Sequence, residues 1–177
     1  LQQQAPGIPL DNFLPEPEPR GTASVVGLAA AVLSQRDPEA VMLILPSDHY
    51  IRNRDEFHRI MRVAIMVAKQ GFLVTLGIKP TFPSTGYGYI QQGEALAGEY
   101  DHAVHQVVRF IEKPNEIVAE QLIAAGNHSW NSGMFIWRVD RILAEINRQM
   151  PALAKTLQTI SAAWGKADQL QVLQKEW

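Results

Sequence analysis

A strand, a helix and a second strand follow one another between residues 40 and 78. Residues 40–45 are a continuous apolar run, which is typical of a parallel strand buried on both faces. Residues 55–71 carry apolar side chains at helical spacing, with Asn53 and Glu56 at capping-box spacing and with Gly71 at a position where helices commonly end. Residues 72–78 are a second apolar run. This order predicts a βαβ unit and restricts the chain to α/β folds.

The rest of the chain extends this alternation. Residues 14–22, "LPEPEPRGT", predict an extended surface loop, and Thr22 or Ser24 is expected to cap a helix that runs to about Gln35, with small residues allowing close packing. Residues 104–114 predict a strand, residues 115–127 a helix and residues 132–139 a strand. The segment 139–177 is expected to be mostly helical. The sequence therefore predicts a sheet with helices packed on both faces.

Composition excludes several functional classes. The 177 residues are 46% hydrophobic and 19% charged, with net charge -2 and no basic stripe, so neither nucleic acid nor an anionic membrane is expected as a partner. Cysteine is absent, which excludes disulfides, thiolate zinc sites and cysteine nucleophiles and fits a reducing, cytoplasmic compartment. The longest apolar stretch, Val25–Leu33, is far shorter than the roughly 20 residues that cross a bilayer. No signal peptide is recognisable.

Asp48 is the first candidate for chemistry. It follows Pro46 directly beyond the predicted strand 40–45, and ligands of open α/β sheets bind beyond the carboxyl ends of strands. A carboxylate there suits Mg²⁺, which shares its oxygen ligands with phosphates. The alternative is that Asp48 only caps the turn. His49 beside it is interpreted as structural, because adjacent side chains diverge on an extended segment.

Three further stretches could contact a ligand. In "PSTGYGYI", Gly86 and Gly88 flank Tyr87 and could bring backbone amides close to a sugar hydroxyl or a phosphate, or could simply form a turn. In "FIEKP", Glu112 could accept from sugar hydroxyls and Lys113 could hold a phosphate, or the two could be a solvated ion pair.

In "SWNSGMF", Asn131 could bind a polyol or form an Asx-turn. Trp130 and Trp137 are interpreted as core residues, and His102 and His105 as an improbable metal pair because they face opposite sides of a strand. The chain has no GxSxG, P-loop lysine, HExxH or GxGxxG motif.

Taken in order, five stretches closely resemble successive motifs of the bacterial mannose-1-phosphate guanylyltransferases, or GDP-mannose pyrophosphorylases. They are "EPEPRGTA", "LILPSDHYI", "LVTLGIKPTFPSTGYGYIQQGE", "VVRFIEKPN" and "WNSGMFIW". The likeness extends from about Glu16 to Arg138. It implies a Rossmann-like, GT-A-like nucleotidyltransferase fold with a mixed sheet flanked by helices, of which residues 1–177 are the central part of one domain.

The resemblance also implies a reaction and its ligands. GTP and mannose 1-phosphate would give GDP-mannose and pyrophosphate with Mg²⁺, and the protein would mainly position two anions and neutralise charge. By this likeness, Asp48 would coordinate Mg²⁺, and Asp48 and Lys113 would be catalytic. Mannose 1-phosphate would contact residues of three stretches (Gly86, Tyr87, Gly88, Glu112, Lys113 and Asn131). Glu16, Arg20 and Thr22 would border the guanine and ribose. A homodimer is one candidate assembly that the sequence does not decide.

The sequence departs from the family at two places. Its base loop reads "RGTAS" where the family usually has Arg-Asn-Thr-Ala-Pro, so Gly21 and Ser24 weaken the inference about the base. The Gly-rich loop GxGTRLxPLS and a second metal-binding Asp, expected beyond Trp177, are absent, so these 177 residues are expected to be an incomplete domain without turnover. The alternatives are a nucleotidyltransferase for another sugar 1-phosphate and a non-catalytic nucleotide-sugar-binding regulatory subunit.

Overall fold

The computed structural model describes residue 3 and residues 6–177, and the chain divides into two compact units. One unit is Val41–Arg138, which carries the sheet, and the other combines the residues up to Ala40 with Val139–Trp177 and is helical. We call them the sheet unit and the helical unit and describe each by itself.

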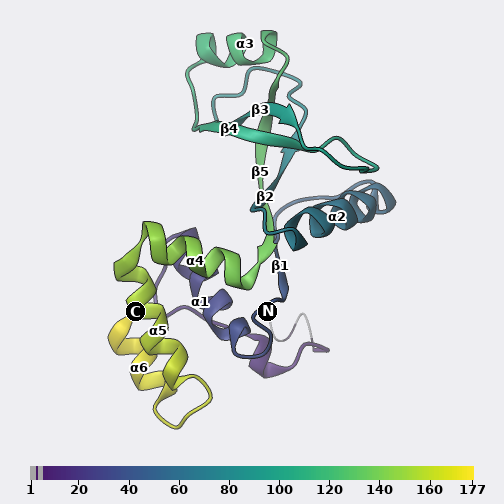
Figure 1. Cartoon of the computed structure of the whole chain (residues 1–177). Coiled ribbons are helices and arrows are strands. Elements are labelled where there is room, and N and C mark those ends of the chain that lie inside the picture. The colour runs from purple at the N-terminus through teal and green to yellow at the C-terminus, as the bar shows by residue number, and fades with distance from the viewer. Residues whose placement is uncertain (1–2, 4–5) are drawn as a thin grey trace. The chain divides into compact units, whose positions relative to one another are not determined.

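The sheet unit contains five strands and two helices (Figure 1). Along the chain these are β1 (Val41–Ile44), α2 (Arg54–Lys69), β2 (Val74–Ile78), β3 (Tyr89–Ala95), β4 (His105–Ile111), α3 (Glu116–Ala124) and β5 (His128–Arg138). The sheet order is β1-β5-β3-β4, with β2 paired to β5 as well. Because three strands pair with β5, that strand organises the sheet.

The strand directions differ from the expectation for β1. Leu43 of β1 pairs with Ile136 of β5, and Val74 of β2 pairs with the same Ile136, both in antiparallel register. The predicted parallel strand buried on both faces is therefore wrong: the neighbour of β1 is antiparallel, and Leu43 is 40% exposed. Strands β1 and β2 still run in the same direction, because each is antiparallel to β5. The predicted strand–helix–strand order is confirmed, with β5 standing between the two strands.

The boundaries of α2 follow the signals read from the sequence. The side chain of Asn53 accepts a hydrogen bond from the backbone N–H of Glu56 at 3.1 Å, and Gly71 has φ 93° after the helix ends, so both predicted boundary signals are confirmed. Met61, Ala64 and Ala68 are buried against Ile136 of β5. This contact fixes α2 on the sheet through the burial of one apolar stripe.

Helix α3 packs on the other end of β5. Asn115 caps it by accepting from the N–H of Val118 at 3.0 Å. Ala119 and Leu122 form a buried cluster with Tyr89 and Trp130, which face each other across β3 and β5. Trp130 and Trp137 are each 8% exposed, so their assignment to the core is confirmed.

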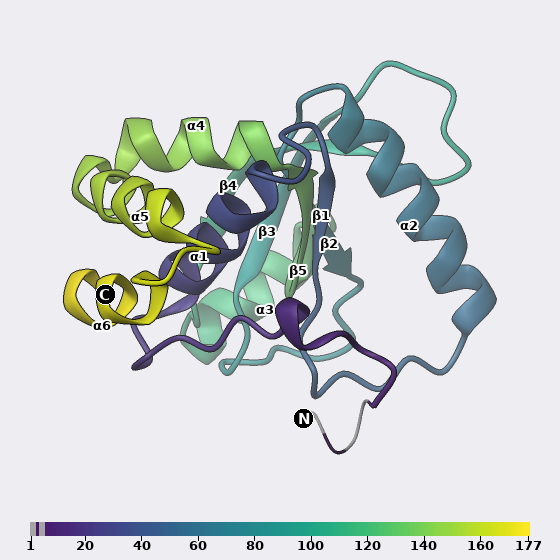
Figure 2. The ribbon, with the colours of Figure 1, turned by 90° about the horizontal axis from the view of Figure 1, so that it is seen from below.

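The helical unit is built around a cluster of apolar side chains from four helices, whose ribbons Figure 2 shows. Its elements are a 3-10 turn (Leu10–Asn12), α1 (Thr22–Ser34), α4 (Val139–Gln149), α5 (Pro151–Ala163) and α6 (Gln169–Glu176). Leu28, Ile146 and Leu157 are among the buried residues of this cluster. A Cβ at Gly27 would lie 2.6 Å from Cδ1 of Leu157, so the predicted close packing of small residues along α1 is confirmed.

The cap of α1 differs from the prediction. Gly21, with φ 87°, occupies the N-cap position, and no side chain caps the helix. Thr22 is already the first helical residue, and the hydroxyl of Ser24 donates to the carbonyl of Arg20. Glycine relieves the strain of this backbone conformation, which explains why neither hydroxyl is used as the cap. Among the described residues, no helix is long and apolar enough to span a bilayer.

Candidate functional site

Three of the predicted ligand-binding residues meet where β3, β4 and β5 lie side by side. Gly88 immediately precedes β3, Glu112 immediately follows β4, and Asn131 lies in β5. The backbone N–H of Asn131 donates to the carbonyl of Gly88 at 2.8 Å. A Cβ at position 88 would lie only 2.8 Å from Oε2 of Glu112 and 3.7 Å from Cβ of Asn131. The fold therefore gathers a carboxylate, an amide and a glycine into one cluster, which we call the Gly88 cluster.

Lys113 joins this cluster through an unusual backbone conformation. It is the only non-glycine residue with positive φ in the described chain, at φ 43°. Its Nζ lies 3.5 Å from Oε1 of Glu112, and both side chains are well exposed. The left-handed conformation brings two consecutive side chains to one side, which a regular strand end does not do. Such strain costs about 1–2 kcal/mol and is typical of functional positions.

The amide of Asn131 has a fixed orientation. Its Oδ1 accepts from the N–H of Gly133 at 3.1 Å, and the hydroxyl of Thr75 on β2 lies 3.4 Å from the same oxygen. An N–H group can only meet an acceptor, so the oxygen of the amide must point to Gly133. The Nδ2 group is consequently the part of Asn131 that remains to meet a ligand.

The glycine-rich stretch is ordered by Ser84 and Tyr89. The N–H of Gly86 donates to Oγ of Ser84 at 3.2 Å, and the fully buried Tyr89 donates its hydroxyl to the carbonyl of Ser84 at 2.9 Å. Tyr87 is turned differently from the Gly88 cluster: its ring packs edge-on against Trp130 at 5.0 Å, and Phe82 packs on Trp130 at the same distance. Because Trp130 and Asn131 are consecutive in β5, their side chains point to opposite faces. The ring of Tyr87 thus belongs to the face of α3.

Asp48 lies in an exposed turn after β1. A Cβ at Gly133 would contact Pro46 at 3.6 Å, so this turn begins beside the segment of β5 that carries Asn131. The described residues contain no group of three His, Cys, Asp or Glu side chains that could hold a metal by themselves. A single exposed carboxylate fits Mg²⁺, because this ion is commonly bound by one or two carboxylates together with substrate phosphates and water.

The residues predicted to border the base lie in the helical unit. Glu16 precedes α1, and its Oε2 is buried and has no hydrogen-bond partner among the described residues. Arg20 is exposed and paired with Glu18, whose Oε1 accepts from Nη2 at 2.6 Å. Thr22 is exposed at the first position of α1. Of the three, only Glu16 carries an unpaired buried atom.

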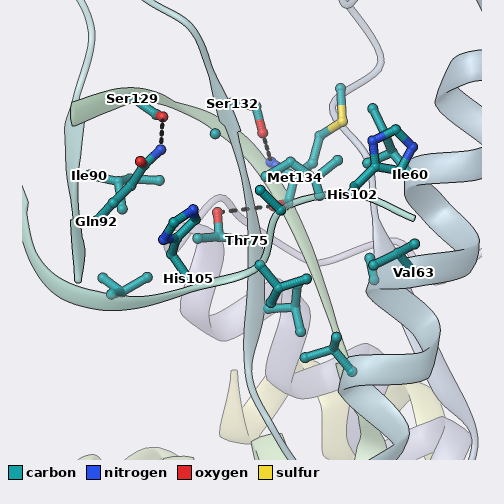
Figure 3. Close-up of a pocket in the computed structure, with 18 of the residues that line it drawn as sticks. Ile60, Val63, Thr75, Ile90, Gln92, His102, His105, Ser129, Ser132 and Met134 are labelled. Atoms are coloured by element: carbon teal, nitrogen blue, oxygen red, sulfur yellow. Dashed lines mark hydrogen bonds between the residues drawn. The ribbon is translucent and has the colours of Figure 1, made fainter. Parts of the chain in front are cut away.

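Sequence reasoning missed a cavity of about 700 Å³ in the sheet unit (Figure 3). Helix α2 contributes Ile60 and Val63, and the sheet contributes polar side chains (Thr75, Gln92, Ser129 and Ser132). His102 and His105 also line it, and Nε2 of His102 lies 3.5 Å from Oε1 of Glu56. Thr75 interrupts the apolar residues of β2, and this is the signal from which the cavity could have been suspected.

His128, at the start of β5, is almost fully buried, and neither ring nitrogen meets a hydrogen-bond partner in the described part of the chain. Burial lowers the pKa of His128 below its ordinary value of 6.5. The nearby backbone of Leu122 opposes this effect, and the positive charge of Arg109 adds to it. The lowered pKa favours the neutral form of the ring.

Comparison with known proteins identifies the class to which this fold and site belong. Residues 8–177 match the family model described as nucleotidyl transferase, so the chain belongs to the nucleotidyl transferase family. The predicted fold class, a nucleotidyltransferase α/β sheet flanked by helices, is confirmed.

Curated relatives are more specific. The chain is 43% identical over 143 residues to the mannose-1-phosphate guanylyltransferase of Escherichia coli K12, covering 80% of the chain and 30% of the relative. It is 40% identical over 163 residues to the mannose-1-phosphate guanylyltransferase of Klebsiella pneumoniae, covering 92% of the chain and 34% of the relative. The predicted family resemblance is confirmed, and the chain spans about a third of the length of these relatives.

Two solved structures share the fold of this chain. A structure described as mannose-1-phosphate geranyltransferase from Thermus thermophilus superposes with TM-score 0.82 at 30% identity, covering 98% of this chain and 48% of that chain. A structure described as mannose-6-phosphate isomerase from Helicobacter pylori superposes with TM-score 0.72 at 31% identity, covering 85% of this chain and 54% of that chain.

Proposed function

We propose that the protein to which this chain belongs transfers a guanylyl group from GTP to mannose 1-phosphate, giving GDP-mannose and pyrophosphate. The observation that carries the proposal is the Gly88 cluster, which places a carboxylate, an amide and an ammonium group at one point of the sheet. The names of the relatives support the same substrates.

The cluster suits a sugar phosphate. The carboxylate of Glu112 can accept from two hydroxyl groups, and the amide Nδ2 of Asn131 can donate to the oxygen of one of them. The ammonium of Lys113, beside Glu112, can neutralise the phosphate of the same ligand. Gly86, Tyr87 and Gly88 are proposed to contribute backbone groups, with Gly88 leaving the space in which the sugar ring meets Glu112.

In this reaction the protein mainly positions the substrates and forms no covalent bond with them. A phosphate oxygen of mannose 1-phosphate attacks the α-phosphorus of GTP in line, the new P–O bond forms, and the bond to the β-phosphate oxygen breaks to release pyrophosphate. Glu112 and Asn131 hold the sugar and Lys113 holds its phosphate, so that the attacking oxygen is kept in place, which lowers the barrier by orientation. Members of the family generally use a divalent metal. Asp48 would hold Mg²⁺, which would neutralise charge on the phosphates when bound.

The base side of the proposal rests on Glu16. Its Oε2 has no hydrogen-bond partner among the described residues, and a carboxylate can accept from the N1–H and N2–H₂ donors of guanine. Arg20 and Thr22 are proposed to border the ribose and phosphates near the start of α1. An adenine or pyrimidine base does not offer this pair of donors, so the proposal predicts a preference for GTP.

The test is pyrophosphate release by the protein in its natural length, with a panel of nucleoside triphosphates and sugar 1-phosphates. GTP with mannose 1-phosphate is expected to give the highest kcat/KM. A higher value for glucose 1-phosphate would replace the sugar assignment, and specific binding of GDP-mannose without any turnover would favour a regulatory subunit. A homodimer and a cytoplasmic location remain predictions, which sedimentation and cell fractionation can check.

A further inference from the structure

We infer that Thr75 positions Asn131, so that Asn131 serves its ligand only as a hydrogen-bond donor and, together with Glu112, selects a hydroxyl group. The inference rests on the proposed function, because it concerns the sugar side of the same site. Thr75 lies on β2, it was given no ligand role from the sequence, and its hydroxyl faces β5 (Figure 3).

The first step is the irregular segment of β5 between Asn131 and Met134. Gly133 has φ 70°, and the register between β2 and β5 shifts between Thr75 and Gly77. Two short hydrogen bonds hold this bulge: Gly133 N–H donates to Oδ1 of Asn131, and Met134 N–H donates to Oγ of Ser132 at 3.1 Å. Bulges of this kind redirect a side chain next to a functional site.

The second step is the position of the Thr75 hydroxyl between the two ends of the bulge. Its Oγ1 lies 3.2 Å from the carbonyl oxygen of Met134 and 3.4 Å from Oδ1 of Asn131. A hydroxyl has one proton, which these two acceptors share. Thr75 therefore joins the amide of Asn131 to the backbone at the far end of the bulge, and removing its hydroxyl breaks this link and leaves Oδ1 held by the N–H of Gly133 alone.

The third step is the consequence for the ligand. With Oδ1 occupied by Gly133 and Thr75, Asn131 can present only its two N–H donors. Glu112, across the position of Gly88, is a carboxylate and can only accept when ionised. A single group that accepts from Asn131 and donates to Glu112 needs both a lone pair and a proton, which a sugar hydroxyl has and an ionised phosphate oxygen or an ammonium lacks. The pair therefore suits a sugar hydroxyl better than the phosphate of the same ligand.

The first experiment needs no ligand. In the ¹⁵N spectrum of the full chain, the side-chain amide signals of Asn131, assigned by their loss in Asn131→Ala, are expected to shift and broaden in Thr75→Val. They should stay in place in Thr75→Ser, which keeps the hydroxyl. Unchanged Asn131 signals in Thr75→Val would overturn the inference. Thermal unfolding of each variant reports whether β2 still pairs with β5.

The second experiment is titration calorimetry with mannose 1-phosphate alone. Thr75→Val is expected to weaken binding by about 3- to 10-fold, the usual effect of one neutral hydrogen bond, while Thr75→Ser stays within about 2-fold. Because Thr75 acts through Asn131, the double variant Thr75→Val/Asn131→Ala should bind no more weakly than Asn131→Ala. If the loss of affinity in the double variant equals the product of the losses in the two single variants, the inference is overturned. Thr159→Val, which removes a hydroxyl bonded within α5, is the matched control and should not change binding.

These outcomes separate the inference from the function. If the wild-type chain binds mannose 1-phosphate and the two substitutions weaken binding independently, only the role of Thr75 is refuted. A wild-type chain that gives no heat with mannose 1-phosphate, with the Asn131 signals behaving as expected, refutes the proposed sugar site and leaves the fixed amide standing.

Discussion

The substitution Gly88→Ala tests the Gly88 cluster most directly, because the structure separates its effect on binding from its effect on folding. The added Cβ would lie 2.8 Å from Oε2 of Glu112, closer than non-bonded atoms tolerate. The atom that must move is the tip of a side chain that is 72% exposed, so it can turn into solvent. Since Gly88 does not have positive φ, alanine adds no backbone strain. The free energy of unfolding should change by less than about 0.5 kcal/mol.

The affinity of Gly88→Ala for mannose 1-phosphate should change far more than its stability. Displacing Glu112 removes hydrogen bonds from the sugar hydroxyls to a charged acceptor, worth about 1.5–3 kcal/mol, so the affinity for mannose 1-phosphate should fall by about 10- to 150-fold. Calorimetry measures this, and urea unfolding measures the stability. The control is Gly86→Ala, whose Cβ would lie 3.8 Å from Oγ of Ser84, an ordinary contact, and whose effect should be within about 3-fold. Equal affinities for the two variants, or a large loss of stability in Gly88→Ala, would refute the reasoning.

Four further predictions follow from single positions. Lys113→Gly relieves the strained φ of 43°, so it should be about 1 kcal/mol more stable than Lys113→Ala in urea unfolding, while both lose affinity for mannose 1-phosphate equally. Asp48→Asn leaves an exposed turn intact, so the melting temperature should stay constant while Mg²⁺-dependent pyrophosphate release by the natural-length protein collapses; near-normal release would exclude the metal role. Burial lowers the pKa of His128, so the unfolded chain takes up a proton as pH falls through 6.5 and the folded chain does not. The free energy of unfolding should therefore decrease as pH falls below 6.5, and His128→Leu should flatten that dependence in urea titrations. Gly77→Ala places a Cβ 2.6 Å from that of Ser129, so it should cost about 1–3 kcal/mol in urea unfolding, and the second change Ser129→Gly should restore part of the loss.

Local signals predicted the elements that depend on local chemistry. Asn53 and Gly71 mark the ends of α2 because a cap and a positive φ are satisfied within a few residues. The direction of β1 was mispredicted because an apolar run reports burial and not the partner strand. The partner, β5, lies far along the chain, and it begins at His128, before the predicted start at Ser132. Only pairing with Gln91 of β3 extends it to that point.

In the candidate site, likewise, the residue types could be predicted from the sequence and their contacts could not. Glu112 and Asn131 could be singled out as residue types that bind polyols, and family resemblance supplied their roles. Their meeting at Gly88 depends on the register of three strands, which the sequence does not encode locally. The role of Thr75 could not be predicted from the sequence, because its hydroxyl contacts Asn131 and Met134 only through the bulge in β5. The ring of Tyr87 packs on Trp130, which the sequence did not indicate, and its predicted ligand contact through backbone groups stays a prediction.

The dependence of the sheet on β5 has a consequence for synthesis on the ribosome. Strands β1 and β2 pair with β5 and, in the described part of the chain, with no other strand. During translation both must wait as unpaired apolar segments until residues 128–138 emerge, while β3 and β4 can already form their hairpin. Exposed apolar strands without a pairing partner are the segments that chaperones bind and that aggregate when unprotected. A nascent chain arrested before His128 should therefore be sensitive to protease over β1 and β2, and one arrested well after Arg138 should be protected.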